Sequence, residues 1–311
     1  NPPNDHRLYP NMCNTYDGIY NKIKRQISDE VNEITSIWQC GKNNREIAHG
    51  KKIYSWKDPR CTAENLGFNG NKVKNIINKI LDFNRDGTKT ININKLDHNN
   101  LNWRSEDLTF YIDFETISSF LLTLNKKSNI QVDGDYLFMI GIGWKEPNSN
   151  EWNYECIYAD EVSLNEEKKI LDIFINKINK LNIKFNTNGK LVHWSQAENI
   201  IFSKICDRHN IFKLLNWFDL LKFFKDNEIL IFGALNFSLK TIAKAMKSHK
   251  MIDSIWDDDI SNGLDAMFLS WKEYIHNGDI FNSKIFKDVI KYNEIDCKTT
   301  YEILQYLKIN H

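Results

Sequence analysis

The sequence lacks long hydrophobic runs and closely spaced cysteines. No apolar run approaches the roughly 18 residues of a transmembrane helix, and no signal peptide precedes the first polar segment, so we expect no membrane association. The six cysteines are scattered and include no Cys-x-x-Cys pair. This argues against a zinc ribbon or a disulfide scaffold, and it favours an intracellular, reducing compartment, either cytoplasm or nucleus. The chain begins at Asn1 and not at methionine, which leaves open a further domain upstream.

The composition is that of a globular protein. Hydrophobic residues make up 41% and aromatic residues 13% of the 311 residues, enough for one large domain or two ordinary ones. The net charge is zero, but residues 1–107 carry 17 Lys and Arg against 13 Asp and Glu, and the remainder carries 24 against 28. A basic N-terminal part is compatible with nucleic-acid contact, and an acidic C-terminal part is compatible with cation binding.

The front part is expected to be helical. We interpret residues 1–27 as an irregular arm, 28–83 as a helical domain, 84–107 as a polar linker and 108–311 as a second domain. Glycine turns at Gly41 and around 66–73 resemble a helix-hairpin-helix unit, whose backbone N–H groups face a phosphate. Nucleic acid would then meet the cations at its helix starts, Lys42, Arg45, Lys72 and Lys74. The alternative is a small packing domain with solvated lysines.

The stretch Leu-Thr-Phe-Tyr-Ile-Asp-Phe-Glu-Thr at 108–116 alternates apolar and polar residues, which predicts a β-strand. Alternation places Asp113 and Glu115 on one face, about 6.6 to 7 Å apart. Two carboxylates on one face of an apolar strand repel each other and resist burial, and a divalent cation between them relieves both effects. Taken alone, this Asp-x-Glu pattern is more often an edge strand with a solvated acidic face, so the rest of the chain has to decide.

The later elements predict the fold class. Strands are expected at 136–144, 152–159 and 190–194, with a helix from a capping box at 163–166 and a second helix at 198–209. The last third is expected to be helical at 214–224, 238–246, 264–274 and 286–307. Three strands followed by helix, strand and helix is the order of an RNase H-like α/β fold, a mixed central sheet flanked by helices.

Two further motifs supply partners for the strand carboxylates. Tyr292 and Asp296 are four residues apart and share one helix face. Tyr-Ile-Asp-Phe-Glu-Thr and Tyr-Asn-Glu-Ile-Asp-Cys together resemble the first and third motifs of the DEDD 3′–5′ exonucleases, in the tyrosine-bearing subclass (DEDDy). At the second-motif place, the His-Trp-Ser-Gln-Ala-Glu segment from His193 carries Glu198 where that family has aspartate. In this respect the whole chain, over roughly residues 8–308, resembles the C-terminal part of RecB-like nucleases that carry a YprB-type RNase H-like domain, in which such a segment takes the second-motif place.

The resemblance implies a two-metal phosphodiesterase site. Two Mg²⁺ or Mn²⁺ ions would be held by four carboxylates: Asp113, Glu115, Glu198 and Asp296. One ion would lower the pKa of the attacking water and the other would stabilise the leaving 3′ oxygen, while Tyr292 orients or helps to deprotonate the water. Apart from the resemblance, His193 could contact a phosphate of the nucleic acid, although a histidine at the end of a strand is more often a structural hydrogen-bonding residue. Asp219 is a rival fourth ligand, although a helix-starting role suits it better, and the acidic run at 257–259 is interpreted as a solvated loop.

Three functions follow from this reading. The leading hypothesis is a metal-dependent nuclease acting on DNA or RNA from the 3′ end. The alternative is a catalytically weak or inactive RNase H-like module that binds or scaffolds nucleic acid, because the extra methylene of Glu198 can displace a metal. An endonuclease or RNA-processing enzyme on the same site is the third, since two-metal chemistry does not choose between an end and an interior bond.

Overall fold

A computed structural model describes residues 3–14, 20–93, 96, 101–104, 108–124, 132, 134–254, 256, 263–276 and 280–311. The acidic run at 257–259 lies outside the described residues. The chain forms two compact units, one of residues 1–96 and 224–251 and one of residues 97–223 and 252–311. This division differs from the expected domain limits in two respects: residues 224–251 belong to the first unit, and so do residues 84–96 of the expected linker.

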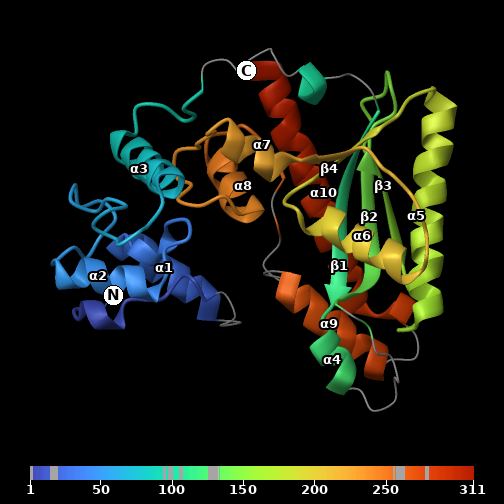
Figure 1. Cartoon of the computed structure of the whole chain (residues 1–311), viewed down its shortest axis with the longest axis horizontal. Coiled ribbons are helices and arrows are strands. Elements are labelled where there is room, and N and C mark those ends of the chain that lie inside the picture. The colour runs from blue at the N-terminus through green and yellow to red at the C-terminus, as the bar shows by residue number, and fades with distance from the viewer. Residues whose placement is uncertain are drawn as a thin grey trace. The chain divides into compact units, whose positions relative to one another are not determined.

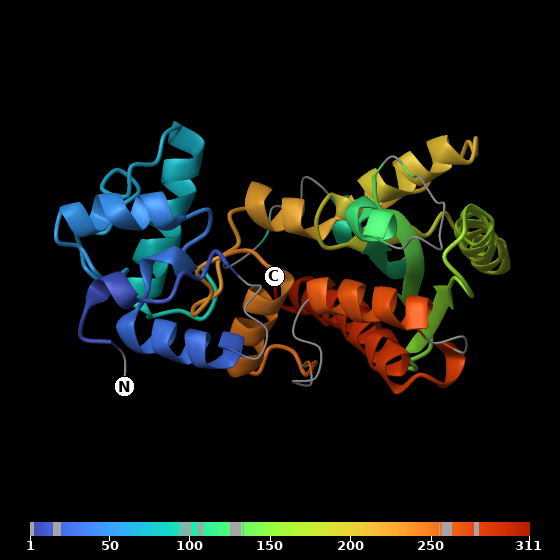
Figure 2. The ribbon, with the colours of Figure 1, turned by 90° about the horizontal axis from the view of Figure 1, so that it is seen from below.

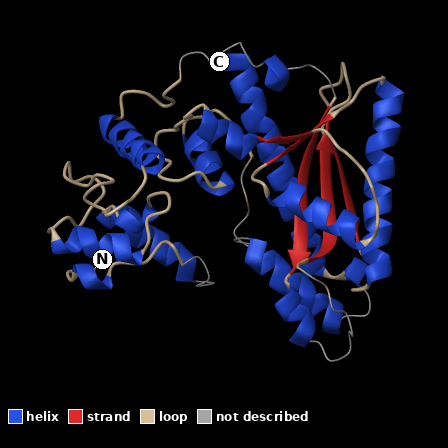
Figure 3. Ribbon diagram, in the orientation of Figure 1, coloured by secondary structure: helices blue, strands red, loops and turns tan. Residues whose placement is uncertain are grey.

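The first unit consists of helices and loops (Figure 3). Its elements are a 3-10 turn at His6–Leu8, α1 (Asn21–Val31), a 3-10 turn at Ile34–Ser36, α2 (Lys42–Gly50), α3 (Asn71–Asp86) and α8 (Leu239–Ser248). The core of this unit consists of small and aliphatic side chains from segments that precede, include and follow α2 in the sequence. Among them are Ile34, Ala48, Leu66 and Ile77. Residues 51–70 separate α2 from α3, a longer connection than the short hairpin that the sequence indicated.

The second unit is built on a five-stranded sheet in the order β3-β2-β1-β4-β5. Its strands are β1 (Thr109–Ile117), β2 (Tyr136–Trp144), β3 (Asn153–Tyr158), β4 (Lys190–His193) and β5 (Trp217–Asp219). β1 pairs with β2 and β2 with β3 in antiparallel fashion, whereas β1 pairs with β4 and β4 with β5 in parallel. β2 and β3 therefore lie on one side of β1, and β4 and β5 lie on the other side. Such a reversal of strand order is where α/β sheets place ligands.

Helices cover both faces of the sheet, as the view in Figure 2 shows. α5 (Leu164–Phe185) and α6 (Ala197–Arg208) lie on one face, and α9 (Gly263–His276) and α10 (Lys284–Asn310) lie on the other. α4 (Ser119–Leu124), α7 (Leu220–Asp226) and 3-10 turns at Leu101–Arg104 and Ile280–Asn282 complete the described elements. The Ser163 hydroxyl accepts from the Glu166 N–H at the start of α5, as the capping motif predicted.

The alternation of β1 divides the core into two layers. Phe110, Ile112 and Phe114 pack with α5 and α6, on the side that also contains Phe174 and Phe202. The residues between them, Asp113 among them, face α10, whose Asn293 bonds the Asp113 carboxylate. Figure 1 shows α10 and β1 in the same part of the second unit. Burial of each large apolar side chain contributes roughly 1.5–3 kcal/mol to stability. The even-numbered residues of β1 therefore anchor the strand in the core, and the odd-numbered face carries Asp113 and Glu115.

One expected element is wrong. The sequence predicted a helix over 214–224, but Trp217–Asp219 form β5 and the helix α7 begins only at Leu220. A three-residue strand is too short for periodicity to indicate, and here parallel pairing of Phe218 with Val192 decides the conformation.

Candidate metal centre

The site lies on β1, next to β2, which carries glycines at positions 141 and 143. Asp113 is directly opposite Gly141 of β2, and Glu115 is opposite Met139. The register shifts between Glu115 and Thr116, so a bulge ends regular pairing just after the second carboxylate. Both carboxylates therefore sit on the face covered by α10, and Glu115 is buried there.

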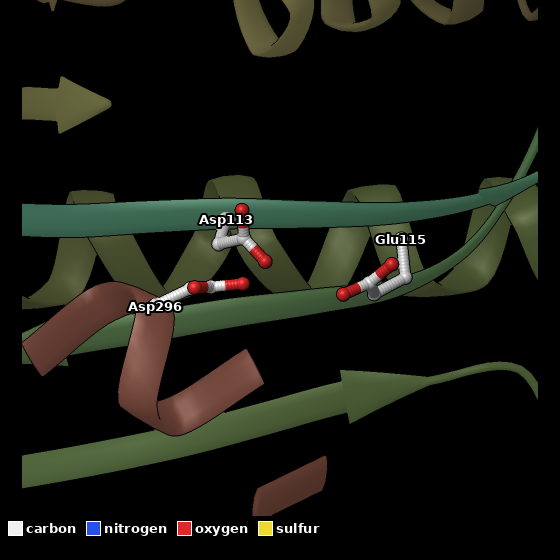
Figure 4. Close-up of side chains that lie close together, drawn as sticks. All are labelled: Asp113, Glu115 and Asp296. Atoms are coloured by element: carbon white, nitrogen blue, oxygen red, sulfur yellow. The ribbon is translucent and has the colours of Figure 1, made fainter. Parts of the chain in front are cut away.

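α10 brings a third carboxylate to this strand. One oxygen from each of Asp113, Glu115 and Asp296 lies within 4.8 Å of the others, and the described residues contain no other such cluster of three potential metal-ligating side chains. Figure 4 shows the Asp113 and Asp296 carboxylates facing each other from β1 and α10, with Glu115 beside them. The structure thus brings together three of the four carboxylates that the sequence singled out.

Asn293, which the sequence analysis did not single out, holds the Asp113 carboxylate. Its side chain is fully buried, and Nδ2 donates to Asp113 Oδ2 at 2.6 Å and to the Asp113 carbonyl at 3.3 Å. Its Oδ1 accepts from the Tyr154 hydroxyl at 2.9 Å. Because an ionised carboxylate can only accept, these bonds fix both the amide orientation and one oxygen of Asp113.

Glycines on β2 allow this approach of α10. A Cβ at Gly141 would lie 1.7 Å from Asn293 Oδ1 and 3.1 Å from Cys297 Sγ. Gly143, two residues further on, packs against Trp152 and Cys297. The Gly-Ile-Gly pattern within an otherwise bulky strand is the sequence signal that could have revealed this close contact.

Tyr292 and Trp256 complete the surroundings of the acidic cluster. Burial, followed by the negative charges of Asp296, Glu115 and Asp113, raises the pKa of the Tyr292 phenol. The phenol therefore remains protonated at neutral pH and can donate a hydrogen bond. The Trp256 indole Nε1 donates to Asp296 Oδ1 at 2.8 Å.

Glu198 is placed differently from the other three carboxylates. It lies at the start of α6, just after β4, and its Oε2 is 3.1 Å from Nδ1 of the buried His193. Burial raises the pKa of the Glu198 carboxyl, and His193 opposes that effect. Because His193 is only 2% exposed and faces Glu198, the structure does not support its expected contact with a phosphate.

The turn between β4 and α6 is held by Asp219. Ser195 has a φ of 102°, an unusual backbone conformation for a residue with a side chain. Its N–H donates to Asp219 Oδ1 at 3.3 Å, and the same oxygen accepts from the Lys222 N–H at 2.8 Å. Asp219 therefore fixes this turn and the start of α7, the helix-starting role that the sequence favoured for it.

The chemistry of the cluster fits a divalent cation. Three carboxylates this close repel one another, and two of them, Glu115 and Asp296, are largely removed from water. Carboxylate oxygens suit Mg²⁺ or Mn²⁺. Asp113, Glu115 and Asp296 are the residues that would hold it.

The expected nucleic-acid ligands of the first unit separate into two groups. Lys42 and Lys72 are exposed and Lys74 is half-buried near the starts of α2 and α3. Arg45 is instead buried, where its guanidinium contacts Glu33 Oε1 at 3.3 Å and the Tyr9 carbonyl at 2.9 Å. These contacts place the Arg45 guanidinium inside the unit, and its expected contact with a phosphate stays a prediction.

The sheet order, the flanking helices and the carboxylates on the central strand define an RNase H-like α/β protein. A family model described as the RNase H superfamily matches residues 128–308, so the chain belongs to this superfamily, and the predicted fold class is confirmed. The match begins after β1; Asp113 and Glu115 precede it, and Asp296 lies within it. Neither the curated proteins nor the solved structures contain a significant match.

Membership of this superfamily suggests a nuclease-type activity with a divalent metal, and RNase H-like domains usually bind nucleic acid. Among the described helices, none combines the length and apolarity required to cross a bilayer. All six cysteines are free thiols.

Proposed function

We propose that this protein is a divalent-metal-dependent nuclease that hydrolyses phosphodiester bonds from the 3′ end of DNA or RNA. The observation that carries the proposal is the convergence of Asp113, Glu115 and Asp296 at the strand where the sheet order reverses. Tyr292, one helical turn before Asp296, supports the tyrosine-bearing DEDD subclass within the superfamily.

The metal, when bound, supplies an acidified water as nucleophile and charge stabilisation for the leaving 3′ oxygen. The residues of this chain position the reactants. Asn293 holds the Asp113 carboxylate in one orientation. Tyr292, which lies one helical turn before Asp296, would orient the attacking water or help to deprotonate it.

Glu198 is the proposed fourth ligand. Glu198 lies in the first turn of α6, the helix that follows β4. Because β4 pairs in parallel with residues 109–111 of β1, the chain leaves β4 next to the part of β1 that carries Asp113. His193 holds the carboxylate in one orientation, as partners of metal-binding carboxylates do. Asp219 is not proposed as a ligand, because two backbone N–H groups already occupy one of its oxygens.

A specific observation favours the second candidate, an RNase H-like module that binds nucleic acid with little or no turnover. Glu198 replaces the expected aspartate and pairs with His193 without joining the cluster of three. If this pairing persists with metal present, the metal set is incomplete and binding remains without hydrolysis.

A nuclease assay separates these functions. The protein is incubated with 5′-labelled single- and double-stranded DNA and RNA in Mg²⁺, Mn²⁺ or EDTA. We expect a metal-dependent ladder that shortens from the 3′ end, and its loss by at least about 100-fold in Asp113→Asn, since the metal supplies several kcal/mol of transition-state stabilisation. Asp172→Asn, which removes an exposed carboxylate on α5, is the matched control and should retain activity.

The outcomes are distinct. Cleavage of circular substrates, which have no 3′ end, would show that the protein is an endonuclease and not an exonuclease. Binding without cleavage in either metal would favour the second candidate. Activity that survives both EDTA and Asp113→Asn would contradict a metal mechanism at this site.

A further inference from the structure

The two units carry opposite charge, although the whole chain is neutral. The first unit has 21 Lys and Arg against 12 Asp and Glu, a balance of +9, and the second has 20 against 29, a balance of −9. This separation is larger than the sequence order indicates, because it depends on the assignment of residues 224–251 to the first unit. Such a concentration of positive charge points to a polyanionic partner.

The segment 224–251 accounts for a third of this excess, with five lysines against two acidic residues. Residues 229–251 contain four lysines and no aspartate or glutamate. The segment is fixed within its unit: the Trp38 N–H donates to the Leu235 carbonyl at 2.8 Å, and the Gly233 N–H donates to Asn84 Oδ1 at 2.8 Å. The preceding Glu228 forms an ion pair with Lys79 on α3.

α8 presents these lysines on one face. Its inner face buries Ile242, Ala243, Ala245 and Met246 in the first unit. Lys240, Lys244 and Lys247 follow the spacing i, i+4, i+7 and therefore share the opposite face. Lys244 is exposed, as is Lys250 just after the helix, whereas Lys240 and Lys247 are half-buried.

We propose that this lysine face of α8 binds the phosphate backbone of nucleic acid independently of base sequence. Lys240 and Lys247 are separated by about 10 Å at 1.5 Å per residue, close to the axial rise of three nucleotides at about 3.4 Å each. Lysine contacts to phosphate carry no base information, so the expected partner is any strand of suitable length. The inference rests on the proposed function for its choice of nucleic acid as the polyanion.

The test is a binding measurement without cleavage. Wild-type protein and the double variant Lys244→Glu with Lys250→Glu are titrated against fluorescent single- and double-stranded oligonucleotides in EDTA, over a series of NaCl concentrations. We expect at least a tenfold loss of affinity at low salt. The slope of log K against log salt should fall by about 0.9 for each lost phosphate contact.

The matched control is Lys168→Glu with Lys180→Glu, which makes the same change in net charge on exposed positions of α5 in the second unit. We expect it to bind within about twofold of wild type, and circular dichroism of both double variants should match wild type. Because Lys168 and Lys180 lie on α5 and outside the acidic cluster, this control should also hydrolyse substrate at the wild-type rate.

Three results would overturn the proposal. If the α8 variant binds nucleic acid as tightly as wild type, this face does not bind it. If the α8 and α5 variants lose equal affinity, the loss comes from the change in net charge and not from the α8 face. Binding of wild type to anionic lipid vesicles, lost in the α8 variant while nucleic-acid affinity is kept, would assign the face to a membrane surface. No binding of wild type to any oligonucleotide would instead contradict nucleic acid as the substrate in the proposed function.

Discussion

Asn293 shows why single residues at this site escape sequence analysis. It lies between Tyr292 and Asp296, the two residues that the motif identifies, yet a buried asparagine has no chemical signature of its own. Its importance comes from two partners far away in the sequence, Asp113 and Tyr154. Distant hydrogen bonds of this kind depend on the sheet register and the helix position together, so periodicity cannot indicate them.

Replacing Asn293 should therefore affect metal binding. We expect Asn293→Leu, which keeps a similar shape but removes the donor, to weaken Mn²⁺ binding about 10- to 100-fold, the usual cost of losing a partner that orients a ligand. Isothermal titration calorimetry or Mn²⁺ paramagnetic resonance measures this without reference to activity. Unchanged Mn²⁺ affinity would show that Asn293 only packs.

Tyr154→Phe provides the complementary measurement. It leaves the Asn293 donor in place but removes the O–H that Asn293 Oδ1 accepts. We expect a loss of stability of about 1–3 kcal/mol, because a buried acceptor loses its partner, with a change in Mn²⁺ affinity of less than about fivefold. Urea unfolding and Mn²⁺ titration of the same samples distinguish the two effects. A larger loss of metal affinity than in Asn293→Leu would reverse the assigned order of importance.

His49 in the first unit gives the protein an acid-sensitive residue. Its Nε2 is buried without a hydrogen-bond partner, and burial, together with His6 and Arg45, lowers its pKa from 6.5 to about 4. Between these values the unfolded chain binds a proton that the folded chain does not, so stability falls as the pH drops from about 6.5 towards 4.

We expect this loss to be on the order of 1 kcal/mol, less than the full shift implies because part of the ring meets solvent. In His49→Gln, the urea midpoint should change less between pH 7 and pH 4.5 than in wild type. An equal change in both proteins would place the acid sensitivity elsewhere.

At the scale of elements, long periodic segments could be predicted and short ones could not. The alternation of β1 and the apolar run of β2 were predicted to within one residue, and the ends of α10 to within three. β5 was assigned to a helix, because three residues do not establish a period and only the pairing with β4 makes them a strand. The pairing of His193 with Glu198 also needed the turn at Ser195, whose backbone conformation the sequence does not announce.

The contact between α10 and β2 is testable through its glycine. Gly141→Ala would place a methyl group against Asn293 and Cys297, which cannot both remain where they are. We expect a loss of about 1–3 kcal/mol from overpacking and weaker Mn²⁺ binding as α10 shifts. Thermal unfolding with and without Mn²⁺ measures both.

Gly50→Ala is the control for Gly141→Ala. No atom lies within 4 Å of a Cβ at this position at the end of α2, so we expect neutral or slightly increased stability. If both substitutions destabilise the protein equally, the close approach of α10 to β2 is not the reason that position 141 requires glycine.

At the scale of the whole molecule, the fold class and three of the four carboxylates could be predicted, but the division into units could not. The motifs indicated Asp113, Glu115 and Asp296 because their spacing is local and their chemistry is distinctive. The return of residues 224–251 to the first unit depends on contacts with residues such as Trp38 and Asn84, more than 100 positions away. The opposite charges of the two units became visible only after that assignment.

This division predicts where metal should stabilise the protein. All three clustered carboxylates belong to the second unit, so Mn²⁺ should slow amide hydrogen exchange in β1 and α10 and leave α2 and α3 unaffected. At a free metal concentration about 100 times Kd the gain is about 2.7 kcal/mol. Asp113→Asn should abolish the gain and, without metal, should be as stable as wild type or more stable, since it removes one of three repelling charges. Equal protection in both units, or protection that persists in Asp113→Asn, would place the metal outside the acidic cluster.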